Sequence, residues 1–141
     1  TLYEKICRMA EWGIAEFLPG LKARTWGRRA QDHSKATYYR KRTEVDGFID
    51  WAQPAGQIHN LIRALTHPYC GAHTFYRGQK IIVWKSSVID RHELPLPMDK
   101  PGQVKRINDD GRAWAQCGSG LLEIVQYQGR VEIGAILGGI K

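Results

Sequence analysis

The sequence predicts an α+β fold, in which an N-terminal helix and an extended linker precede a second helix and a small antiparallel, OB-like β-barrel. Three observations lead to this prediction. Apolar residues recur at helical spacing in two stretches, the period changes to two from Ala72 onward, and turn-forming residues separate the alternating stretches. The chain has 141 residues, 43% of them hydrophobic, which suits about one compact domain with an appendage.

The first helical stretch covers residues 1–20. Its apolar positions follow helical spacing and are Leu2, Ile6, Met9, Ala10, Gly13, Ile14, Phe17 and Leu18. The pair Pro19-Gly20 is expected to end the helix. An amphipathic helix needs a surface that covers its apolar stripe, and the two alternatives are the barrel of this chain and a surface outside it.

Residues 21–48 show neither sustained alternation nor a helical period, so we expect an extended basic linker there. Between Lys22 and Arg42 lie eight basic residues and one acidic residue, Asp32, which give this segment the whole formal net charge of +7. A localised basic strip raises the local concentration of anionic partners. A solvated linker and a phosphate-recognition segment remain the two interpretations.

The second helix is predicted after Pro54, whose missing N–H suits the first turn. Its apolar stripe consists of Ile58, Leu61, Ile62 and Leu65, and Pro68 and Gly71 are expected to end it. Arg63 lies on the flank of this stripe. Near a helix C-terminus an arginine can cap carbonyl groups or form an ion pair, and it can also bind phosphate as a planar fork.

Five strands are predicted after this helix, at residues 72–76, 80–89, 102–107, 112–116 and 121–126. Arg77-Gly78, the run 108–111 and the run 118–120 supply the turns. The Pro-rich stretch His92 to Pro101 is expected to cross the barrel. Five short strands with one longer connection fit an OB-like topology and also other small barrels.

Several classes of protein and site are excluded by the sequence. No apolar run approaches the roughly 20 residues of a membrane span, and three scattered cysteines argue against a disulfide framework, so we expect no membrane partner and a cytoplasmic location. His67, Cys70 and His73 have metal-ligand spacing but lack an evident fourth ligand, so a turn is expected there and no metal. No glycine-rich phosphate loop of standard spacing occurs.

The stretch from Asp46 to Trp84 carries a family resemblance. Its residues are Asp46-Gly47, Ile49-Asp50-Trp51, Pro54-Ala55, Ile58, Asn60, Ile62-Arg63-Ala64-Leu65, Pro68, Gly71-Ala72, Ile82 and Trp84. In this series the chain resembles the linker and C-terminal domain of the formyltransferases, which move a formyl group from 10-formyltetrahydrofolate to an amine.

The resemblance implies a division of the chain. Residues 1–20 are expected to be the last helix of a catalytic domain, and residues 49–141 the C-terminal OB-like domain. The family's catalytic Asn-His pair and Asp belong to that N-terminal domain, which also binds 10-formyltetrahydrofolate. We therefore expect no catalytic residue and no cofactor site in this chain, and the N-terminal catalytic domain is its expected partner. Trp51 and Trp84 are expected in the core.

The candidate residues for binding the acceptor substrate are the strip Tyr39, Arg40, Lys41 and Arg42, with Arg63 as a further candidate contact. Arg40-Lys41-Arg42-Thr43 is similar to the Arg-Arg-Thr run of formyltransferases that act on amino-sugar nucleotides. Forked guanidinium groups beside tyrosines suit a diphosphate and a ring, and the same charge suits tRNA phosphates. We expect a sugar-nucleotide acceptor, with a tRNA-binding domain and a stand-alone binding module as alternatives.

One departure from the family concerns the C-terminus. The chain ends at Ile140-Lys141, where family members continue with a further short strand. The sequence therefore predicts an incomplete barrel or an exposed sheet edge.

Overall fold

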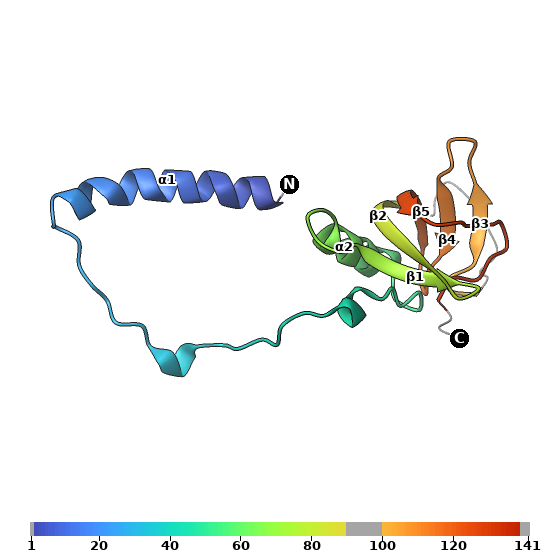
Figure 1. The fold of residues 1–141 in the computed structure, drawn as a ribbon, viewed down its shortest axis with the longest axis horizontal. Coiled ribbons are helices and arrows are strands. Elements are labelled where there is room, and N and C mark those ends of the chain that lie inside the picture. Colours follow the sequence, from blue (N-terminus) through green and yellow to red (C-terminus); the bar gives the residue numbers. More distant parts are fainter. Residues whose placement is uncertain (1, 90–99, 139–141) are drawn as a thin grey trace. The chain divides into compact units, whose positions relative to one another are not determined.

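The computed structural model describes residues 2–89 and 100–138, and these form two compact units that divide between Arg40 and Lys41 (Figure 1). The first unit holds the helix α1 and the linker. The second holds the helix α2 and a five-stranded sheet. The α+β class is confirmed. Most of the predicted Pro-rich crossing, residues 92–99, lies outside the described residues.

Helix α1 spans Leu2–Lys22, two residues further than predicted, with Pro19 inside it. A proline inside a helix removes one backbone hydrogen bond, but its fixed φ is compatible with helical geometry. The helix ends instead at a Schellman motif: Thr25 N donates to Gly20 O (3.0 Å), and Arg24 N donates to Leu21 O (3.2 Å). Arg24 takes the left-handed conformation this motif requires, with φ of 56°.

The remainder of the first unit is extended, as predicted, apart from a 3-10 turn η1 at His33–Lys35. Asp32 caps this turn, because its carboxylate accepts hydrogen bonds from Ser34 N (3.1 Å) and Ser34 Oγ (2.6 Å). Sequence periodicity is too coarse to reveal a turn of three residues.

The second unit opens with a 3-10 turn η2 at Glu44–Gly47, followed by helix α2 at Ala55–Leu65. Pro54 precedes the first helical residue, and its carbonyl accepts a bond from Ile58 N (3.2 Å). The predicted apolar stripe is confirmed: Ile58, Ile62 and Leu65 are buried, and Leu61 packs beside them half-buried. The stripe faces chiefly strand β2.

The strands are β1 (Ala72–Tyr76), β2 (Gln79–Ile89), β3 (Val104–Ile107), β4 (Ala113–Gln116) and β5 (Leu121–Gln128). They form one antiparallel sheet in the order β1-β2-β5-β4-β3. The five predicted strands are all present; β1 has the predicted bounds, and the ends of the others differ by at most two residues. Strand β2 changes register between Val83 and Ser86, a local irregularity that bends a long strand.

Strands β1 and β3 lie at the two edges of this order, so the sheet is not closed by strand pairing in the described part of the chain. The segment Gly134–Gly138 bonds to both sides instead. Leu137 N donates to Gly102 O (2.9 Å) just before β3, and Gly138 N donates to Phe75 O (3.0 Å) on β1. The sequence left an incomplete barrel and an exposed edge as alternatives, and in the described residues this C-terminal segment covers polar groups at both edges of the sheet.

The core lies between the sheet, α2 and the segment before α2. It consists mainly of Ile49, Trp51, Ile58, Ile62, Leu65, Ile81, Val83, Val104, Leu122, Ile124, Val131 and Leu137. Trp51 is placed as expected, and its Nε1 donates to Thr74 Oγ1 (3.0 Å).

Trp84 is not a core residue, which corrects the prediction. Because Ile81 and Val83 point inward, strand alternation places Trp84 on the other face, half-buried, where it stacks on His67 with 4.0 Å between ring centroids.

Candidate functional site

The unit boundary falls inside the predicted recognition strip. Tyr39 and Arg40 belong to the first unit, and Lys41 and Arg42 are the first residues of the second. Tyr39 is 90% exposed and its neighbour Tyr38 is 88% exposed, so both rings are open to solvent. Aromatic side chains with so much exposed area are available for contact with a ligand ring.

Lys41 and Arg42 lead directly into the 3-10 turn η2. The Asp46 carboxylate accepts from Thr43 N (2.7 Å) and from Thr43 Oγ1 (3.3 Å), while Asp46 N donates to Thr43 O (3.1 Å). The Thr43 side chain also lies against the Asp46 backbone N–H, so the two residues form a capping box, which satisfies orphan donors at a helix start. The spacing Thr43-x-x-Asp46 is the signal in the sequence that could have predicted this turn.

An ion pair connects the same turn to the sheet. Lys80 Nζ on β2 donates to Glu44 Oε1 in η2. The Lys80 ammonium holds the pKa of the Glu44 carboxyl below its usual value, chiefly through this hydrogen bond. No local pattern connects two residues that lie 36 positions apart, so sequence reasoning missed this pair.

Arg63 lies on the exposed side of α2, where its Nη2 donates to Asn60 Oδ1 (2.9 Å). Its charge also acts on His59 of the same helix. The pKa of His59 is lowered first by burial and second by the Arg63 guanidinium. His59 Nδ1 lies 3.1 Å from Ser86 Oγ on β2, a contact that ties the helix to the sheet.

His73 lies beneath the η2 turn and is buried. Burial and the nearby Lys80 lower its pKa, and Glu44 acts in the opposite direction. Phe48 and Phe75 surround its ring at centroid distances of 6.0 Å and 5.8 Å. A neutral, enclosed imidazole of this kind packs as a core residue.

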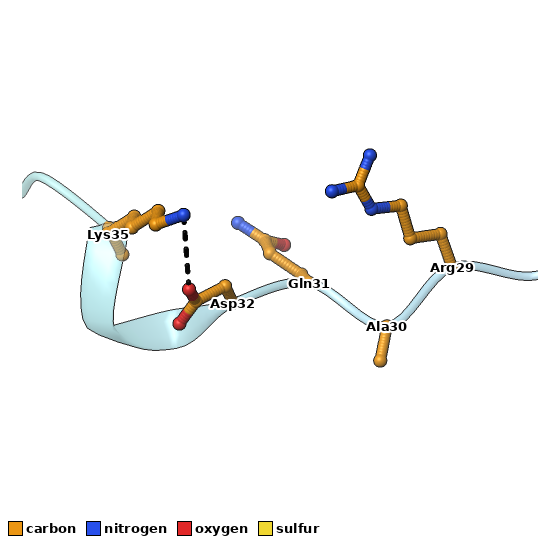
Figure 2. A pocket seen from close by; sticks show the side chains of 6 residues that line it. Arg29, Ala30, Gln31, Asp32 and Lys35 are labelled. Atoms are coloured by element: carbon orange, nitrogen blue, oxygen red, sulfur yellow. Dashed lines mark ion pairs between the residues drawn. The ribbon is translucent and has the colours of Figure 1, made fainter.

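A shallow, open hollow lies along the linker in the first unit. It is lined by residues 29–32, Lys35 and Ala36, and Figure 2 shows Asp32 and Lys35 joined as an ion pair in which Arg29 takes no part. That pair has 3.6 Å between Lys35 Nζ and Asp32 Oδ2 and is mostly solvent-exposed. Asp32 therefore neutralises one linker cation locally and leaves Arg29 available to an anion.

The three potential metal ligands at residues 67–73 lie in three different environments. His67 stacks on Trp84, Cys70 is exposed and His73 packs in the core. Among residues 2–89 and 100–138, His, Cys, Asp and Glu side chains form no group of three or more that could hold a metal ion. Burial raises the pKa of the Cys117 thiol to about 12, so this cysteine stays protonated.

Comparison with solved structures supports the fold. HypX from Aquifex aeolicus, determined as a multiply substituted variant, is similar with a TM-score of 0.63 and 15% sequence identity. The match covers 84% of this chain and 20% of the HypX chain, so the chain spans about a fifth of that protein.

In the described ranges no helix is both long and apolar enough for a bilayer span.

Comparison with protein families identifies the second unit. The family model described as the formyl transferase, C-terminal domain, matches residues 41–133, and its first matched residue is also the first residue of the sheet unit. The match takes in η2, α2 and all five strands. Because it covers well over half of the sequence, the chain belongs to the family of formyltransferase C-terminal domains.

Proposed function

We propose that this chain recognises the acceptor in a formyltransferase that moves a formyl group from 10-formyltetrahydrofolate to the amine of an amino-sugar nucleotide. In this proposal a separate N-terminal catalytic domain binds the folate and supplies the Asn, His and Asp of the reaction. We place the enzyme in the cytoplasm, because free cysteines fit a reducing compartment.

The observation that carries the proposal is the position of the basic strip. Its last cations, Arg40, Lys41 and Arg42, lie where the family domain begins, and in sequence they directly follow Tyr38 and Tyr39, whose rings are exposed. Arginine binds a diphosphate through paired N–H groups, and a tyrosine ring can stack on a base or sugar. Arg63 belongs to the proposal as a second contact, released from Asn60 when the ligand binds.

Helix α1 is assigned a different role. The large apolar side chains of its stripe are exposed, with Met9 at 70% and Phe17 at 54%, and the helix buries no residue. We propose that this stripe packs on the N-terminal catalytic domain, since an apolar helix face gains stability when a partner surface covers it.

Binding to the chain tests the recognition proposal. Titration with uridine diphosphate at low salt should show saturable binding, and Arg42→Ala should weaken it roughly tenfold, the size of a lost charge-assisted hydrogen bond. Arg130→Ala is the matched control, because Arg130 is an exposed arginine of the same unit that pairs with Glu132 at 3.3 Å. Equal losses in both variants, or no binding, would remove the sugar-nucleotide assignment.

In the two-domain enzyme the same substitution has a second readout. Arg42→Ala should raise the KM for the amino-sugar nucleotide and leave the KM for 10-formyltetrahydrofolate unchanged. A change in the folate KM alone would place Arg42 outside the acceptor site.

The length of the basic segment supports tRNA as the second candidate acceptor. Eight cations distributed from Lys22 to Arg42 exceed what one diphosphate needs. If tRNA is the acceptor, log affinity for RNA should fall with log salt by about 0.7–0.9 per phosphate contact, and alanine at Arg28, Arg29 and Arg40 should each flatten that slope. An RNA affinity that does not change with salt, or no RNA binding at low salt, favours the sugar nucleotide.

A further inference from the structure

The turn that follows Lys41 and Arg42 is fixed to the sheet at several points. Phe48 pairs with His73 of β1, and Ile49 N donates to His73 O (2.8 Å). Within the turn Gly47 lies so close to its neighbours that an added Cβ would be 3.2 Å from both Gly71 O and His73 Nδ1. The C-terminal side of the turn is therefore seated tightly on the sheet unit.

Polar contacts hold the N-terminal side of the turn. Asp46 binds the backbone and hydroxyl of Thr43, and Lys80 reaches from β2 to Glu44. Thr43 directly follows Arg42, so these contacts limit the directions in which the chain can leave the sheet. The Glu44–Lys80 pair is half-exposed, and such pairs contribute little to global stability. Its local effect is on the conformation of the adjoining residues.

We propose that Glu44, Asp46 and Lys80 are positioning residues, which hold Lys41 and Arg42 in the orientation that grips the diphosphate of the acceptor. This inference rests on the proposed function of the strip. Ordering a long cationic side chain at a binding surface costs free energy, and a segment ordered in advance avoids part of that cost on binding. Lys80 acts through Glu44 and does not itself contact the ligand.

Substitution of Glu44 distinguishes positioning from simple electrostatics, because the two predict opposite changes in the affinity for an anion. Its carboxylate lies two residues from Arg42, so removal of the negative charge should strengthen binding of an anion if only net charge mattered. If Glu44 positions the strip, Glu44→Gln should weaken binding in spite of the more positive surface. Lys80→Met should also weaken it, by more than Lys85→Met does, since either member of the ion pair is needed to hold the turn.

The experiment measures uridine diphosphate affinity of the chain for Glu44→Gln, Lys80→Met and the double variant. We expect each single substitution to weaken binding roughly threefold to tenfold and the double variant to lose no more than either single one. Lys85→Met is the matched control, because Lys85 is an exposed lysine of the same strand. Tighter binding by Glu44→Gln, or losses that add in the double variant, would overturn the inference.

Amide hydrogen exchange provides a readout that needs no ligand. The amides of Thr43, Asp46 and Phe48 are hydrogen-bonded within the turn, and they should exchange roughly threefold or more faster in Glu44→Gln, Lys80→Met and Asp46→Asn, with core amides of β5 unchanged. Unchanged exchange in the turn would overturn the positioning role even if Arg42 proves essential. If the turn amides exchange faster in these variants but Arg42→Ala leaves the affinity for uridine diphosphate unchanged, the proposed function is rejected instead.

Discussion

The two units of this chain use apolar residues in opposite ways. In the unit from Lys41 to Lys141, α2 and the sheet enclose a core in which Ile62, Ile81 and Leu122 are fully buried. In the unit up to Arg40, α1 is comparably amphipathic but exposes Ile6, Trp12 and Phe17. The same type of helical pattern thus produces a folded core only where the chain also provides the second layer.

The largest expected effect comes from truncation of the same kind of side chain in each unit. Ile62→Ala removes a fully buried side chain of α2 and should lower the free energy of unfolding by about 2–5 kcal/mol. Ile6→Ala in α1 should leave the unfolding of the sheet unit unchanged, because Ile6 is 54% exposed. Urea unfolding followed by tryptophan fluorescence measures both. A large effect of Ile6→Ala would show that α1 stabilises the sheet unit.

The sequence predicted the elements of the sheet unit well because their signals are local. The stripe of α2 and the alternation from Ala72 onward are periodic, and both gave boundaries within two residues of those observed. Trp84 was misplaced although the signal was present: alternation with the buried Ile81 and Val83 assigns it to the opposite face. The family resemblance, which places an aromatic core residue at this position, conflicts with the periodicity, and the structure agrees with the periodicity.

Other features depend on contacts that no local pattern encodes. The Glu44–Lys80 pair and the bonds from Gly134–Gly138 to the edges of the sheet join segments far apart in sequence. The helix end at Arg24 was missed for a different reason, because a left-handed arginine at that position is less common than glycine. The predicted site residues Tyr39, Arg40, Lys41, Arg42 and Arg63 stay predictions, for which the structure supplies exposure and neighbours.

The second prediction concerns how the C-terminal segment covers the sheet edges. Gly102 has φ of +85°, and a Cβ added there would lie 2.2 Å from Leu137 O, the residue whose N–H bonds to Gly102 O. Gly102→Ala should therefore cost more than the roughly 1–2 kcal/mol of a left-handed alanine alone. Gly78→Ala is the matched control, since Gly78 has φ of +75° and open space around it.

Thermal unfolding of both variants measures this difference. If Gly102→Ala costs no more than Gly78→Ala, the segment Gly134–Gly138 can shift without loss, and its hydrogen bonds to Gly102 and Phe75 do not stabilise the sheet. A larger cost, together with faster amide exchange at Leu137 and Gly138, would show that the segment is part of the cooperative unit.

The smallest expected effect is on pH dependence, and it again separates the two units. In the sheet unit the pKa of His59 is lowered by burial and by Arg63, so folding favours the neutral imidazole. A group whose pKa is depressed by folding contributes stability above its ordinary value of 6.5, and this contribution is lost as the pH falls through 6.5 toward the folded pKa. His73 acts in the same direction. The free energy of unfolding should therefore decrease between about pH 7.5 and about pH 5.5.

His59→Gln should flatten this dependence, because the variant has no imidazole to protonate at the Ser86 contact. A dependence that persists in the His59 and His73 double variant would assign the effect to other groups.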